Sequence, residues 1–165
     1  MSMNARKTKY GALAAALAAT IAVGALIADV GGEDIAPKLP TERVRIEIAN
    51  GKTHDFDLEM ALSPVDQKIG LMYRKAIAKN GGMLFWMGPP PRPVSFWMKN
   101  TYVPLDMIFV AEDGKILHIH PQATPLSLDP VSSMHPVVAV IELKGGRAED
   151  LGIVPGARVS HRLFD

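Results

Sequence analysis

The side chains best suited to binding or catalysis lie between two apolar runs, in the segment SFWMKNTYVPLDM (Ser95–Met107). Lys99, Asn100 and Thr101 follow two aromatic residues and a methionine, and Asp106 interrupts the next apolar run. Charged groups flanked this closely by large apolar side chains are partly desolvated, and leaving one unpaired costs about 1–3 kcal/mol or more. We therefore expect these groups to meet one another, a bound ion, or water in a cleft.

Arg74 is the second cationic side chain that could take part, and we expect it to converge with Lys99, Asn100 and Asp106 on one rim of the domain. A guanidinium and an ammonium can grip a carboxylate or phosphate, and neutral polar groups add hydrogen bonds. The candidate ligand-binding residues, which include one aromatic ring able to stack on a sugar, are Arg74, Trp97, Lys99, Asn100, Thr101, Asp106 and Glu142. The partners that they indicate are an anionic small molecule or an envelope glycan. The structural alternative is an ion-pair network in which Asp106 pairs with Arg74 or Lys99.

Glu142 stands inside the apolar run VVAVIEL (137–143). If that run is a central strand, Glu142 either faces outward or is a buried carboxylate that needs a partner such as Arg74 or Lys99. Two carboxylates about 5–10 Å apart in an open cleft would favour glycoside chemistry. The sequence therefore leaves two classes open: a binding or accessory module, and a hydrolase acting on an envelope sugar or peptide through Asp106 and Glu142.

A metal-binding protein is a third class of function, and most features of the sequence argue against it. The chain has no cysteine, which excludes thiol catalysis and cysteine metal sites. His118 and His120 lie two apart on an expected strand, and methionine with histidine suits Cu(I), so a periplasmic Cu(I)-binding protein is an alternative. However, most methionines stand among Leu, Ile and Phe like core residues, and a third zinc ligand cannot be named. We expect no metal site and no cofactor.

The elements that must position these residues are mostly short strands. Asn50-Gly51 between two alternating runs predicts a β-hairpin. Ser63 and Pro64 stand where a helix should start, and Asn80-Gly81-Gly82 where it should end, which predicts one principal helix near residues 64–79. The fold class is mainly β, a small barrel or sandwich-like domain over residues 41–165, with a two-layer α+β fold as the alternative.

Four sequence blocks carry a resemblance to a known family. They are GLMYRKAI (70–77), GGMLFWM (81–87), SFWMKNTYVPLDMIFV (95–110) and VIELKGG (140–146). In these blocks the chain resembles the family called domain of unknown function 192, over about Val44 to Leu163. The resemblance implies a small, mostly β, often exported domain, and it implies no reaction.

The N-terminal end resembles an export signal. Arg6, Lys7 and Lys9 precede an uncharged run from Gly11 to Ala28, which predicts a cleaved signal peptide or a retained inner-membrane anchor. Residues 29–40 are rich in Gly and Pro, which predicts a flexible linker. We expect a periplasmic domain, free or anchored, whose N-terminal segment contacts the inner membrane. After residue 28 the net charge is −2, so nothing indicates nucleic acid as a partner.

Overall fold

The computed structural model describes residues 38–165 of the chain. The predictions for residues 1–28, and for most of the linker at 29–40, lie outside the described residues. At the end of that linker, the backbone N–H of Leu39 donates to the Glu59 carboxylate at 2.8 Å, and the Pro40 carbonyl accepts from Met60 at 3.0 Å. No helix among the described residues is long and apolar enough to cross a membrane.

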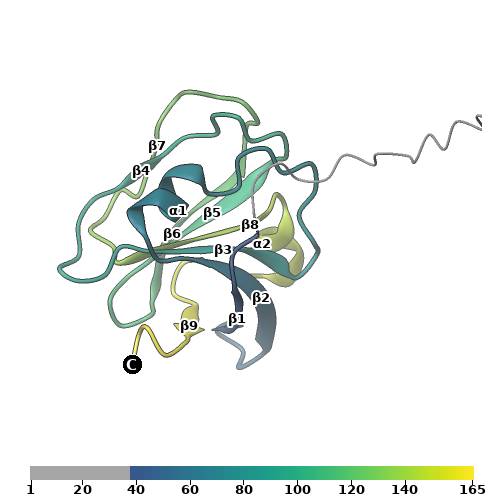
Figure 1. The fold of residues 1–165 in the computed structure, drawn as a ribbon. Coiled ribbons are helices and arrows are strands. Elements are labelled where there is room, and N and C mark those ends of the chain that lie inside the picture. Colours follow the sequence, from purple (N-terminus) through teal and green to yellow (C-terminus); the bar gives the residue numbers. More distant parts are fainter. Residues whose placement is uncertain (1–37) are drawn as a thin grey trace, which may run out of the picture. The chain divides into compact units, whose positions relative to one another are not determined.

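Nine strands and two short helices make up this part of the chain (Figure 1). The elements in chain order are β1 (Thr41–Glu47), β2 (Thr53–Ala61), α1 (Pro64–Ile69), β3 (Gly81–Trp86), β4 (Ser95–Phe96), β5 (Leu105–Val110), β6 (Ile116–Ala123), β7 (Val131–Ser132), β8 (Ala139–Lys144), α2 (Arg147–Leu151) and β9 (Arg158–Ser160). Seven strands form one sheet in the order β6-β5-β8-β3-β2-β1-β9, and β4 pairs with β7 in a second, two-stranded sheet. Only the β2–β3 pair is parallel among these ladders.

The large sheet curls until its two edges approach each other. Lys115, just before β6, forms a bridge with Arg158 of β9, and the Ile116 N–H donates to the Ala157 carbonyl at 2.9 Å. The sheet is therefore a half-barrel, which confirms the predicted mainly β, barrel-like fold class. The Asn50-Gly51 hairpin is also confirmed, because β1 and β2 pair antiparallel around it and Gly51 has φ +80°.

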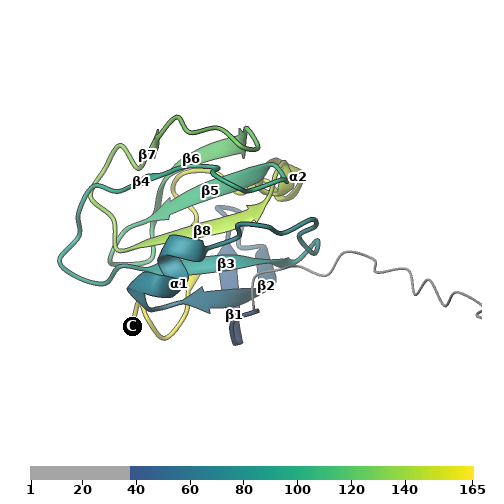
Figure 2. The same ribbon diagram turned by 45° about the horizontal axis from the view of Figure 1, so that its top comes forward.

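Each face of the sheet carries its own apolar core, as the two-residue period of strands requires. The inner core collects side chains from both ends of the curled sheet, including Val44 of β1 and Val159 of β9. The outer core lies on the other face of β3, β5 and β8 and includes Met83, Met107 and Val140. In Figure 2, α1 and the connections that carry β4 and β7 lie over this part of the sheet.

The principal helix is much shorter than predicted. Its start is confirmed, because Ser63 Oγ accepts the backbone N–H of Asp66 at 3.2 Å and Pro64 is the first helical residue. It ends at Ile69 because Gly70 takes φ +51°, and a Cβ there would lie 3.1 Å from the Phe85 ring. Residues 70–80 form turns and irregular backbone, and no residue of α1 is buried.

Candidate ligand-binding site

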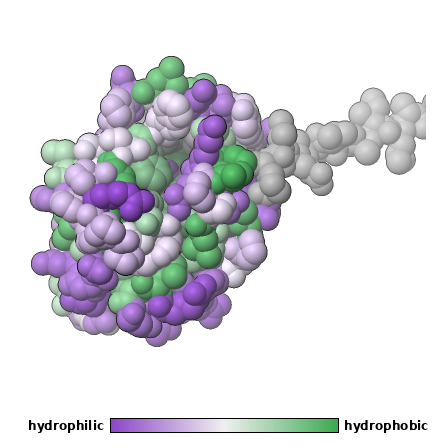
Figure 3. Space-filling view, turned by 60° about the vertical axis from the view of Figure 1, so that its left-hand side comes forward, coloured by the Kyte–Doolittle hydropathy of each residue, from purple (hydrophilic) through white to green (hydrophobic). Residues whose placement is uncertain are grey.

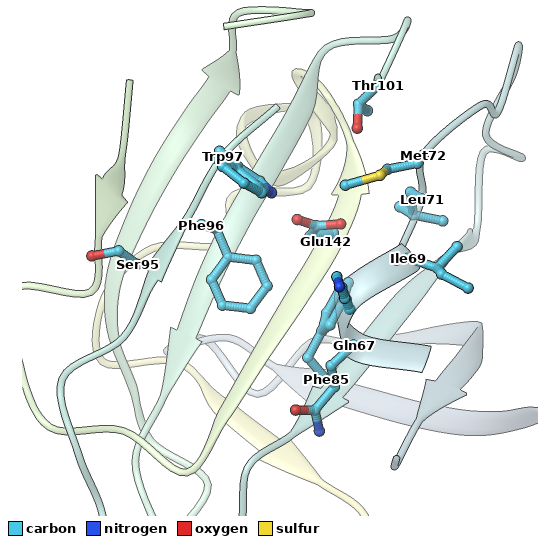
Figure 4. A pocket seen from close by; sticks show the side chains of 12 residues that line it. Gln67, Ile69, Leu71, Met72, Phe85, Ser95, Phe96, Trp97, Thr101 and Glu142 are labelled. Atoms are coloured by element: carbon cyan, nitrogen blue, oxygen red, sulfur yellow. The ribbon is translucent and has the colours of Figure 1, made fainter. Parts of the chain in front are cut away.

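A cavity of about 190 Å³ lies on the outer face of the sheet, between α1 and the segment that includes β4. Glu142 of β8 points into it, beneath Trp97 and beside the Phe96 ring (Figure 4). We call this space the Glu142 cavity. Its lining residues are Gln67, Lys68, Ile69, Gly70, Leu71, Met72, Phe85, Ser95, Phe96, Trp97, Thr101 and Glu142.

Strand register explains why Glu142 points outward from the half-barrel. Glu142 lies opposite Met83 of β3 on one side and Met107 of β5 on the other, so all three side chains share the outer face. Both methionines are buried, which places the carboxyl group between two thioether side chains. Gly82 helps β3 approach closely here, because a Cβ at that position would lie 2.1 Å from the Glu142 carbonyl oxygen.

The Glu142 carboxyl group is buried and has no partner in the described part of the chain. The residue is 4 % exposed, and no hydrogen bond or ion pair from residues 38–165 reaches its side-chain oxygens. Burial raises the pKa of Glu142 from 4.5 to about 8. Desolvation disfavours the charged form, and no neighbouring cation offsets it. At neutral pH Glu142 is therefore mainly a neutral carboxylic acid.

Aromatic rings form one wall of the cavity. Phe85 and Phe96 pack edge to face, with ring centroids 5.0 Å apart and an interplanar angle of 84°. Trp97 is 51 % exposed, so its ring lies at the mouth. The Lys99 ammonium sits 5.2 Å from the centre of the Trp97 ring, a cation–π distance.

A second, more open depression adjoins the cavity, and we call it the outer groove. It measures about 700 Å³ and shares Lys68, Ile69, Met72 and Trp97 with the Glu142 cavity. Its lining residues are Pro64, Val65, Lys68, Ile69, Met72, Tyr73, Trp97, Lys99 and Asn100. Val65 of α1 is 66 % exposed, so the helix contributes apolar surface to this groove. Figure 3 shows apolar surface in separate patches among polar ones on one side of the molecule.

The segment that carries Lys99, Asn100 and Thr101 is a tight turn. The Thr101 N–H donates to the Met98 carbonyl at 3.0 Å, and Asn100 takes φ +55°, a conformation that asparagine tolerates. The turn is fixed to residue 73, since the Tyr73 N–H donates to the Asn100 carbonyl at 2.7 Å and the Asn100 amide donates to the Tyr73 hydroxyl at 2.8 Å. The turn thus presents Lys99 and Asn100 to the outer groove and Thr101 to the cavity.

Arg74 is not part of this cavity. Its guanidinium forms an ion pair with Glu59 of β2 at 2.8 Å, and Arg74 is only 2 % exposed. Glu59 lies opposite Met83 in the parallel ladder, on the same face as Glu142. Sequence reasoning missed Glu59 as the partner, although its place in the alternating strand HDFDLEMA (54–61) put it on the face opposite the inner core.

Asp106 is on the wrong face of the sheet for the predicted rim. Its neighbour Met107 shares the outer face with Glu142, so Asp106 points to the inner face. Its carboxylate accepts three backbone N–H groups, from Gln122 (2.9 Å), Gly146 (2.9 Å) and Ala148 (2.7 Å). The predicted pairing of Asp106 with Arg74 or Lys99 is therefore wrong. Asp106 holds the start of α2 and the end of β6 in place.

Because Asp106 and Glu142 point to opposite faces of the sheet, the predicted hydrolase that uses both carboxyl groups is also wrong. Asp106 and Glu142 cannot flank one bond in a common cleft, because the sheet itself separates their carboxyl groups. The predicted partners of Glu142, Arg74 or Lys99, do not reach it either.

The two histidines predicted to face the same way do so, and they line a different cavity. His118 and His120 of β6 lie opposite Phe109 and Met107, and a cavity of about 430 Å³ brings them together with Met98 and Met134. Burial lowers the pKa of His118, and His120 and His135 add to that effect. No group of three or more His, Cys, Asp or Glu able to hold a metal occurs within residues 38–165.

Comparison with known proteins places this arrangement in a family. The family model DUF192, described as Uncharacterized ACR, matches residues 45–161. The chain belongs to the DUF192 family.

Two solved structures share the fold of this DUF192 chain. A proposed transcription regulator from Sinorhizobium meliloti 1021 is 46 % identical, with a TM-score of 0.73, over 76 % of this chain and 96 % of that one. A protein of unknown function from Novosphingobium aromaticivorans DSM 12444 is 35 % identical, with a TM-score of 0.71, over 78 % of this chain and 95 % of that one. No match was found among curated proteins.

Five of the seven candidate residues thus line the cavity or the outer groove, namely Trp97, Lys99, Asn100, Thr101 and Glu142. Sequence reasoning missed Phe85, Phe96, Gln67 and Met72. Phe85, Phe96 and Met72 stand within the family blocks, but their apolar character alone did not separate them from core residues.

Proposed function

We propose that this DUF192 domain binds a small ligand in the Glu142 cavity and acts as a binding or accessory module of the cell envelope. The observation that carries the proposal is the Glu142 carboxyl group, which is buried and has no partner in the described chain. The residue is 4 % exposed but lines the cavity, so its carboxyl oxygens are reached from the cavity and are not sealed within the protein. A ligand that reaches the cavity would supply the missing partner.

The size of the cavity limits what fits. A water molecule occupies about 30 Å³ in the liquid, so 190 Å³ holds roughly six groups of that size. This is below the range of about 300–1,000 Å³ typical of pockets for drug-sized ligands. The cavity therefore suits a small molecule or one end of a longer molecule, whose remainder would lie in the adjoining outer groove.

A fragment screen tests this proposal. The full-length chain is mixed with small amines, carboxylates, alcohols and sugars, and binding is followed by ligand-observed NMR. We expect at least one class to bind the wild type and to lose binding in Trp97→Ala. Tyr102→Ala is the control, because Tyr102 is similarly exposed but does not line the cavity. If no fragment binds, or if both variants lose binding equally, the cavity is not the ligand site.

A second candidate function rests on the cavity beside β6. Two imidazoles and two thioethers from His118, His120, Met98 and Met134 are donors that suit Cu(I). Titration of the full chain with Cu(I) against a chromogenic competitor tests it. Binding of one Cu(I) that is lost in His120→Gln would support a copper site, whereas equal binding by the wild type and the variant would exclude it.

A further inference from the structure

We infer that the ligand of the Glu142 cavity is a small zwitterion, with its ammonium group against Glu142 and its anionic end toward Lys68 and Lys99. This inference rests on the proposed function, and it names the ligand class for the same site. It differs from the anionic molecule or glycan expected from the sequence, because the buried ionisable side chain of the cavity is an acid.

The inner end of the cavity is suited to a cation. Glu142 is the buried ionisable group there, and no described cation lies within ion-pair distance of it. Phe85 and Phe96 stand nearly perpendicular, and Trp97 closes the same wall. Aromatic faces beside a carboxylate are the usual surroundings of bound organic ammonium groups. The attraction of this wall for cations is already visible in the Lys99 ammonium at the Trp97 ring.

The outer end has the opposite charge. Lys68, in the last turn of α1, lines both the cavity and the outer groove, and Lys99 lines the groove. A simple cation would meet two positive charges on its way in, whereas a carboxylate or phosphate at the far end of the ligand would be attracted. Between the two ends lie Ile69 and Met72, which suit an apolar link.

The inference predicts that the affinity for the ligand depends on pH. The ammonium group binds ionised Glu142, and burial raises the pKa of this residue to about 8. Affinity should therefore rise about tenfold between pH 7 and pH 9, since the ionised fraction rises from about one tenth to about nine tenths. A ligand that instead accepts a hydrogen bond from the neutral acid would lose affinity over the same range.

Three other ionisable groups lie in the same cavity or in the same cross-strand row as Glu142. Lys68 lines the same cavity, while Glu59 and His120 lie two strands away in the same cross-strand row, beyond Met83 and Met107. Glu59 is paired with an arginine. The pH profile is therefore repeated in Lys68→Met and His120→Gln, and we expect its rise to persist in both.

The experiment compares three molecules that share a six-carbon chain: 6-aminohexanoate, hexylammonium and hexanoate. Calorimetry with the full-length chain at pH 7 and pH 9 measures each affinity. We expect 6-aminohexanoate to bind tightest, and Glu142→Gln to weaken it at least tenfold at pH 9 while leaving hexanoate unchanged. Lys68→Met should weaken 6-aminohexanoate toward the affinity of hexylammonium. Glu112→Gln, an exposed change away from the cavity, is the matched control.

The outcomes separate the inference from the proposed function. If hexanoate or a neutral fragment binds better than 6-aminohexanoate, and Trp97→Ala abolishes that binding, the domain binds ligands in this cavity but the zwitterion inference is wrong. The inference also fails if Glu142→Gln leaves the affinity for 6-aminohexanoate unchanged. If none of the three binds and the fragment screen finds no ligand that depends on Trp97, the proposed function fails as well.

Discussion

Asp106 and Glu142 lie on the neighbouring strands β5 and β8, yet their side chains project from opposite faces of the sheet. Both carboxyl groups are buried, but their surroundings differ completely. Asp106 accepts three backbone N–H groups, whereas the Glu142 carboxyl group meets no partner in the described chain. The first therefore has a structural role, and the second is free to contact a ligand.

Asp106→Asn should destabilise the fold strongly. The asparagine amide would point an N–H₂ at donors that now bond to a carboxylate, so at least one buried N–H, such as that of Ala148, would be left unsatisfied. We expect a loss of about 2–4 kcal/mol in the free energy of unfolding, measured by urea denaturation. A change below about 0.5 kcal/mol would contradict the structural role. Glu112→Gln, at an exposed position, is the control.

The buried pair of Arg74 and Glu59 gives a second prediction. Arg74→Met leaves the Glu59 carboxylate without its guanidinium in a partly buried position, and removal of one member of such a pair typically costs about 3–5 kcal/mol. The double variant Arg74→Met/Glu59→Leu should recover most of this loss. Thermal unfolding of the two variants provides the comparison, and equal stability of the single and double variants would show that the unpaired Glu59 carboxylate is not the cause of the loss.

Glu142→Gln should stabilise the fold, in contrast to the two variants above, and only at higher pH. Burial raises the pKa of Glu142 from 4.5 to about 8, so between these values the folded chain holds a proton that the unfolded chain has released. The wild type therefore loses stability as pH rises through this window, by at most about 4–5 kcal/mol at 1.4 kcal/mol per pH unit. Glutamine cannot ionise, so the variant escapes this loss.

Urea denaturation of the wild type and Glu142→Gln at pH 5, 7 and 8.5 measures this difference. The variant should differ from the wild type by less than about 1 kcal/mol at pH 5 and become progressively more stable above it. A difference that stays constant with pH would mean that Glu142 titrates normally.

Export remains a prediction from the sequence. The basic residues before the apolar run at 11–28 favour a signal peptide or an anchor that leaves the domain outside the inner membrane. A reporter enzyme that is active only in the periplasm, fused after Pro40, should be active. Activity of a cytoplasm-dependent reporter at the same position would exclude export, and the size of the mature chain would distinguish a cleaved signal from an anchor.

Local sequence signals predicted the local parts of the structure well. Asn50-Gly51 and Ser63-Pro64 each specify a turn or a helix start through their own backbone preferences, and both are found where predicted. The end of α1 was wrong because Gly70 stops the helix where the Phe85 ring lies close, and that contact joins positions 15 residues apart. Apolar periodicity after residue 69 could not reveal it.

The candidate site was predicted only in part, because local sequence signals do not reveal contacts between distant positions. Residues within one block, such as Trp97 and Lys99, were correctly placed near one another because the chain itself connects them. The faces of Asp106 and Glu142 depend on the register between β5 and β8, and a shift of one residue would reverse them. The sequence contains no local signal for that register, so it could not show that Glu142, and not Asp106, faces the cavity.

The ionisation of Glu142 tests the account most directly. The side-chain carboxyl carbons of glutamate can be followed by ¹³C NMR as pH is changed, and Glu142→Gln identifies the signal. For the ligand-free chain we predict a pKa of about 8, which should fall when a saturating ammonium ligand is present. A Glu142 pKa near 4.5 in the ligand-free chain would mean that water or a protein group already satisfies the carboxylate, and the central claim would be wrong.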